Sequence, residues 1–206
     1  MKRFIRLMTS VLALLLVVSA QVFAQDDTEV ESKRDSAAVA RRLSSRNAFE
    51  RREAAEEIAR LAATEHRRLV EGYRVQEKDA RVQVAMDWAL YRLGKGEAIY
   101  PLVRALDSKQ ADQVVKYLSG LETPAPLYAV LPRVNGNTQI RLLEVLAHVG
   151  DRETLEQIKP YTASLDPGIA DAAKFAEREI TIRLEETPAP EPKRQRQVSK
   201  GETSEP

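Results

Sequence analysis

The stretch "ALYRLGKGEAIYPLVRAL", residues 89–106, contains two apolar-patterned segments joined by a turn with two glycines. The first segment completes a run in which apolar residues recur every three or four positions, from Val82 to Leu93. The second segment has the same spacing from Ile99 to Leu106. This spacing is typical of one face of an amphipathic helix. The stretch therefore predicts a helix, a short turn and a second helix.

The apolar pattern of this helical hairpin recurs twice further along the chain, each time after 28 residues. Leu90 is followed in this way by Leu118 and Leu146. The other columns with the same spacing are Met86, Val114 and Leu142; Leu93, Leu121 and Val149; Ile99, Leu127 and Leu155; Leu102, Val130 and Ile158; and the turn positions Gly94, Glu122 and Gly150. Self-similarity at a fixed period indicates stacked repeats. The sequence therefore predicts an all-α fold, a short right-handed α-solenoid.

The repeat domain is expected over residues 46–184, as about four hairpins and a C-terminal capping helix. Residues 25–45 are expected to form a linker and an N-terminal capping helix, with Val39 and Leu43 facing inward. Helix starts are predicted where a capping residue precedes an apolar run. The predicted starts are Asn47 with Glu50, Asp107 with Gln110, Thr123 before Pro124, and Asp166 before Pro167.

Residues 79–106 resemble a short HEAT-type repeat of the phycobilisome-lyase-like kind. The residues that match the family pattern are Asp79, Val82, Ala85, Ala89, Leu90, Leu93, Gly94, Ala98, Ile99, Leu102 and Leu106. Gln83 stands where the family usually has Arg, and Glu122 stands where it usually has Gly. The resemblance covers roughly residues 46–182. It implies an interaction scaffold, and it does not imply lyase chemistry.

The N-terminus has the three parts of a secretory signal peptide. A basic start is followed by an apolar run over about residues 11–20, and Val22 and Ala24 then suit a cleavage site. The run is shorter than the ~20 residues that a membrane-spanning helix needs. We therefore predict that residues 1–24 are removed, that the mature chain starts at Gln25, and that the protein is exported to the periplasm without stable membrane insertion. An uncleaved anchor is the alternative.

The C-terminal residues 185–206 contain four prolines and almost no large apolar side chains. Such a segment buries too little surface to offset the entropy lost on ordering. It is expected to be a disordered, solvated tail. The basic stretch "KRQRQVSK", residues 193–200, leaves a binding arm as the alternative.

Charge and composition exclude several functions. The full chain carries 32 basic and 31 acidic residues, and loss of the three bases in the predicted signal peptide leaves 29 against 31, a formal charge of −2. Such a chain is not strongly attracted to nucleic acid. It has no cysteine, and His66 and His148 fall in different repeat units. No phosphate-binding loop or nucleophile motif is present. We therefore expect no metal, no cofactor and no enzymatic activity.

A tyrosine- and arginine-containing stripe along the second helices is the predicted partner-binding site, because these residues are enriched at protein interfaces. It comprises Tyr73, Arg74, Tyr100, Val103, Arg104, Tyr128 and Leu131. The alternative is that these tyrosines pack between neighbouring repeats. A second patch contains Val84, Trp88 and Tyr91, and Trp88 is expected to pack against the preceding repeat.

The sequence thus predicts an exported, non-catalytic scaffold or adaptor that binds a protein partner through the concave face of a HEAT-like solenoid. The alternative is an accessory regulatory subunit of an exported enzyme complex, acting through its basic tail. The oligomeric state is left open.

Overall fold

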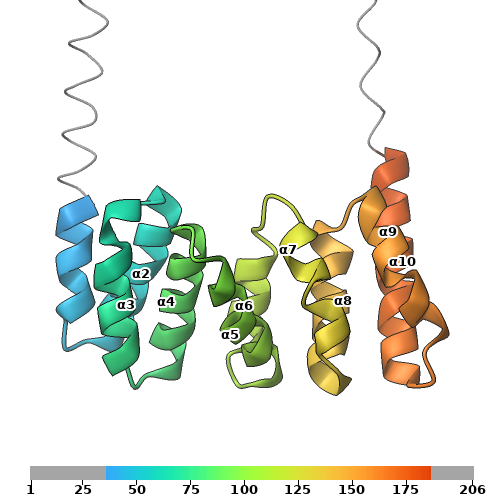
Figure 1. Cartoon of the computed structure of the whole chain (residues 1–206), viewed down its shortest axis with the longest axis horizontal. Helices are drawn as coiled ribbons and strands as arrows, with labels where there is room; N and C mark the ends of the chain where they lie inside the picture. Colours follow the sequence, from blue (N-terminus) through green and yellow to red (C-terminus); the bar gives the residue numbers. More distant parts are fainter. Residues whose placement is uncertain (1–35, 187–206) are drawn as a thin grey trace, which may run out of the picture.

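The computed structural model describes residues 36–186, and within this range all regular secondary structure is helical (Figure 1). The prediction of an all-α fold is therefore confirmed for this part of the chain. The predicted signal peptide and the tail after residue 186 lie outside the described residues. In the expected N-terminal cap, residues 36–41 form a helix that η1 (Arg42–Ser44) continues, and Leu43 is fully buried.

The helices form pairs that lie side by side in chain order (Figure 1). The first helices of the pairs are α2 (Ala48–Leu61), α4 (Ala80–Arg92), α6 (Ala111–Leu118) and α8 (Gly136–Val149). The second helices are α3 (Arg67–Gln76), α5 (Ile99–Arg104), α7 (Ala125–Tyr128) and α9 (Arg152–Ile158). The helix α10 (Pro167–Glu186) follows the fourth pair. Short 3-10 turns adjoin the second helices: η2 (Thr64–His66), η3 (Gly96–Ala98), η4 (Ala105–Asp107), η5 (Leu131–Arg133) and η6 (Lys159–Ala163).

Three of the five apolar columns of the 28-residue repeat are buried in all three units. The column Leu90, Leu118 and Leu146 is buried throughout. The columns Met86, Val114 and Leu142, and Leu102, Val130 and Ile158, are buried as well. Equivalent positions in successive pairs therefore contribute to one continuous core, as apolar stripes on neighbouring helices do.

The glycine column of the repeat is maintained for two different reasons. Gly94 has a φ of +89°, a left-handed conformation that glycine adopts without strain. Gly150 has ordinary backbone angles, but a Cβ atom there would lie 2.6 Å from the Ile180 Cδ1 atom and 2.9 Å from the Thr154 Cγ2 atom. The third pair has Glu122 at this position.

Most of the expected helix starts are present, with different partners in places. Asn47 Oδ1 accepts a hydrogen bond from the Phe49 amide, and Asp166 Oδ1 accepts one from the Gly168 amide. The expected capping box of Asp107 with Gln110 was wrong. Gln110 itself is the residue before α6, and the Ser108 hydroxyl accepts its amide hydrogen bond. A serine one residue after Asp107 can close this tight turn, so the aspartate is not needed.

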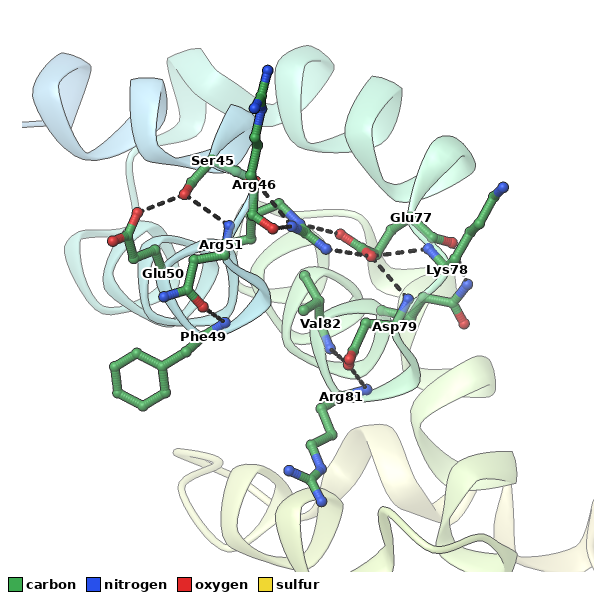
Figure 2. Close-up of polar contacts among 12 residues, drawn as sticks. Ser45, Arg46, Phe49, Glu50, Arg51, Glu77, Lys78, Asp79, Arg81 and Val82 are labelled. Atoms are coloured by element: carbon green, nitrogen blue, oxygen red, sulfur yellow. Dashed lines mark hydrogen bonds and ion pairs between the residues drawn. The ribbon is translucent and has the colours of Figure 1, made fainter.

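An ion pair between Arg51 and Glu77 joins the first pair of helices to the start of α4 (Figure 2). The Arg51 Nε and Nη2 atoms lie 2.7 Å and 2.9 Å from the two Glu77 carboxylate oxygens. Arg51 also donates to the Ser45 carbonyl, and Glu77 accepts from the Asp79 amide. Asp79 in turn caps α4 by accepting from the Val82 amide. This network holds the N-terminal end of the helix row in one arrangement.

Candidate functional site

The structure does not assemble the predicted second-helix stripe into one exposed surface. Val103 and Leu131 are fully buried and belong to the core, so the expectation that they line an exposed apolar strip was wrong. The second helices are short and adjoin 3-10 turns. A 3-10 turn advances each residue by a larger angle than an α-helix does. Leu131 lies in η5, where this larger angle turns it into the core. Val103 lies in the α-helix α5, four residues after the buried Ile99, and so it shares the buried face of that helix.

Two polar members of the stripe form side-chain hydrogen bonds within the chain, and a third packs against the core. The Tyr128 hydroxyl donates to Asp151 Oδ1 at 3.0 Å and lies 2.7 Å from Thr154 Oγ1. Burial is the main cause that raises the Tyr128 pKa to about 12. The Arg74 guanidinium forms two hydrogen bonds with the buried Asp87 carboxylate, at 2.7 Å and 2.9 Å. Tyr73 is partly buried against the core. These contacts favour packing, the alternative role for the tyrosines.

Tyr100 and Arg104 are the members of the stripe that are exposed. The Arg133 Nη1 atom lies 3.4 Å from the Tyr100 hydroxyl oxygen. Because their apolar neighbour Val103 is buried, these two side chains do not form a continuous apolar surface. The predicted stripe is thus reduced to two isolated polar positions.

The second predicted patch, on α4, is an aromatic stack between two helix pairs. Trp88 lies between Tyr91 and Tyr117, with ring centroids 5.8 Å and 5.6 Å away. The prediction that Trp88 packs against the preceding repeat was wrong in direction, because Tyr117 belongs to α6 of the following pair. The Tyr117 hydroxyl donates to Glu56 of α2 at 2.6 Å, and burial raises its pKa well above the usual range. Val84, the third member of the patch, is buried.

A groove lies further along the row of first helices. It has a volume of about 690 Å³. It is lined by α6, α8 and α10, with α8 in the middle. Its lining residues are Asp112 and Val115 of α6; Ile140, Arg141, Glu144 and His148 of α8; and Gly168, Asp171, Ala172 and Phe175 of α10. The spacings of three and four residues put each set on one face of its helix.

Contacts at both ends of α8 fix one wall of this groove. Near the start of α10, Gly168 allows close approach, since a Cβ atom there would lie 2.8 Å from the Ile140 Cδ1 atom. Near its end, the Arg183 guanidinium donates to the Ala147 and Gly150 carbonyls. The two helices therefore run in the same direction and are tied together along their length.

The groove combines an apolar floor with a mostly acidic rim. The floor residues Val115, Ile140, Ala172 and Phe175 are apolar, and Phe175 is 38% exposed. The rim carries the carboxylates of Asp112, Glu144 and Asp171, against which Arg141 supplies one positive charge and lies 3.2 Å from Glu144. His148 is exposed beside them. In residues 36–186, no group of three His, Cys, Asp or Glu side chains is placed to hold a metal ion. An apolar floor with a charged rim suits binding of an amphipathic ligand.

Sequence reasoning missed this groove because it looked for the binding surface on the second helices. The 28-residue repeat did contain a signal for an open surface around α8. Trp88 fills the outer surface beside α4, and the equivalent positions in the next two pairs are Lys116 and Glu144. Without a large aromatic ring at Glu144, the surface around α8 stays open.

Comparison with known proteins found no family model, no curated protein and no solved structure that matches this chain. Between residues 36 and 186, no helix combines the length and the apolar character that crossing a membrane requires.

Proposed function

We propose that the protein is an exported, non-catalytic scaffold or adaptor, built as a short right-handed solenoid of HEAT-like repeats. It binds a protein partner through the groove on α6, α8 and α10. The observation that carries the proposal is the apolar floor with the exposed Phe175, next to the contacts that tie α8 to α10. Exposed apolar surface with a polar rim is typical of protein-interaction sites.

The shape and the chemistry of the groove support a protein segment as the ligand. An open groove along a helix suits an extended peptide or a partner helix, which inserts apolar side chains at regular intervals. Phe175 is an aromatic side chain at the surface, and aromatic residues contribute strongly to binding when a partner covers them. The repeat architecture supports the same function, because stacked helical pairs create extended binding surfaces.

The test is a pair of substitutions at exposed phenylalanines. Phe175→Glu places a charge on the groove floor, and Phe49→Glu makes the same change on α2, outside the groove, where Phe49 is 55% exposed. The partner is first captured from the envelope fraction with the wild-type chain and identified. Its affinity for each purified variant is then measured by calorimetry.

We expect Phe175→Glu to weaken binding more than about tenfold, which corresponds to ~1.4 kcal/mol. Phe49→Glu should leave the affinity unchanged, and both variants should melt like the wild type. Full affinity in Phe175→Glu, or loss in Phe49→Glu alone, would place the partner elsewhere and contradict the proposal.

A further inference from the structure

The charge on the groove rim selects for a basic occupant. Asp112 and Asp171 face solvent, and neither forms an ion pair or hydrogen bond within the described residues. Arg141 offsets the charge of Glu144, so the rim retains two uncompensated carboxylates on opposite walls. Charge complementarity across an interface favours the matching partner and disfavours others.

The chain itself contains a segment with this chemistry. Residues 193–200 read "KRQRQVSK", with four basic side chains, no acidic side chain and the single apolar residue Val198. Basic residues flank Val198 on both sides, as the carboxylates on α6 and α10 flank the apolar floor. The segment and the groove are therefore complementary in charge. Each also has an apolar centre with charged groups on both sides.

The connection between the segment and the groove is long enough for both to meet within one molecule. The helix α10 lines the groove near its start and ends at Glu186. The distance from Glu186 back to Asp171 along the helix is about 22 Å at 1.5 Å per residue. Residues 187–193 span up to about 24 Å when extended. The segment can therefore reach Asp171 from the end of α10.

We infer that residues 193–200 bind in the groove of their own chain, with basic side chains against Asp112 and Asp171 and Val198 toward the apolar floor. The inference rests on the proposed function, because it treats the same groove as a binding surface and names its occupant. The consequence is regulatory. A partner that uses the groove must displace the segment, so its apparent affinity falls in proportion to the fraction of chains in which the groove is free.

The absence of cysteine allows a direct test in the full mature chain. Ser199→Cys introduces a single thiol beside Val198 for a nitroxide spin label. The amide signals of isotope-labelled protein are then compared before and after the label is reduced. We expect the label to broaden Val115 and Ile140 strongly at low salt, and to leave Glu71, on the second helix α3, unaffected. Broadening should weaken in high salt, which shortens the range of charge interactions.

Charge reversal supplies the matched controls. Asp112→Lys with Asp171→Lys should abolish the broadening, and so should Arg194→Glu with Arg196→Glu. Combining the two pairs should restore it, a recovery that misfolding would not produce. The inference is overturned if the label does not broaden the Val115 and Ile140 amide signals in the protein without charge reversals. It is also overturned if either pair of charge reversals alone leaves the broadening intact.

A mixed sample distinguishes one chain from two. Spin-labelled chain without isotopes is mixed with isotope-labelled chain that carries no spin label. Broadening in this sample would mean that the tail of a second copy occupies the groove, and it would overturn binding within one chain. Failure of the proposed function is read separately, from the partner affinity of Phe175→Glu. Partner binding that depends on Phe175 while the spin label has no effect would remove this inference alone.

Discussion

Glu77→Ala is expected to destabilise the N-terminal half of the helix row by removing the centre of the network in Figure 2. The Glu77 side chain is 6% exposed and that of Arg51 is 19% exposed. Removing one partner of a buried ion pair costs about 3–5 kcal/mol, because the other charge is left uncompensated. Arg51 keeps its hydrogen bonds to the Ser45 and Arg46 carbonyls and part of its contact with water. We therefore expect a smaller loss of about 2–3 kcal/mol in the free energy of unfolding.

The assay is thermal and urea unfolding of the purified chain, followed by circular dichroism. For a domain of this size a loss of about 2–3 kcal/mol lowers the melting temperature by roughly 5–10 °C. Glu57→Ala is the matched control, since Glu57 pairs with Arg60 on the surface of α2, and it should melt near the wild type. A double-mutant cycle with Arg51→Met isolates the pairwise energy. The reasoning is refuted if Glu77→Ala unfolds no earlier than Glu57→Ala, or if the cycle gives no coupling.

The same network predicts a dependence on pH with a definite sign. The hydrogen bond from Arg51 is the main cause that lowers the Glu77 pKa, and the Asp79 and Lys78 amides add to it. A carboxylate with a lowered pKa in the folded state contributes stability above its unfolded pKa of about 4.3, and loses it as the pH falls through the folded value. The wild type should therefore lose stability on acidification below about pH 4.3, and Glu77→Gln should lose less over the same interval.

Three further predictions concern packing and processing. Gly150→Ala should destabilise the chain by about 1–3 kcal/mol, because the new methyl group meets Ile180 and Thr154. Gly72→Ala has open space around the new methyl group and should stabilise the chain by about 0.4–1 kcal/mol. Equal melting temperatures for the two variants would contradict this prediction. Leu118→Ala should cost about 2–5 kcal/mol in urea unfolding, because Leu118 is fully buried in the repeat column; a loss below about 0.5 kcal/mol would argue against the register. N-terminal sequencing of the periplasmic protein should begin at Gln25, and an intact Met1 in a membrane fraction would contradict cleavage.

The sequence predicted the features that depend on local spacing. The burial of Leu118 follows from a period that places Leu90 and Leu146 on equivalent helix faces, and a period is a property of the sequence itself. The cap at Asp166 follows from chemistry within three residues. Both predictions need no knowledge of how one helix is oriented against another.

Features that depend on contacts between helices were not predicted in the same way. The prediction placed Tyr128 on a partner-binding stripe, because tyrosine is enriched at protein interfaces. In the structure the Tyr128 hydroxyl bonds to Asp151 and Thr154, at the cap of α9. Asp151 lies more than twenty residues from Tyr128 in the chain. The spacing of apolar residues contains no information about such a partner.

The position of the groove follows from the way in which the repeats differ. Stacking buries the columns that the repeats share, so these residues form the core. They are similar in every pair and therefore do not distinguish one junction between pairs from the next. At the outward position of the first helices, Trp88 stacks on Tyr117 and fills the surface between α4 and α6. Two units later the same position is Glu144, and the neighbouring α10 approaches α8 closely at Gly168. A surface that is filled at one junction is therefore open and acidic at another. The proposed binding groove therefore lies at a position where the repeats differ, with Trp88 on α4 and Glu144 on α8.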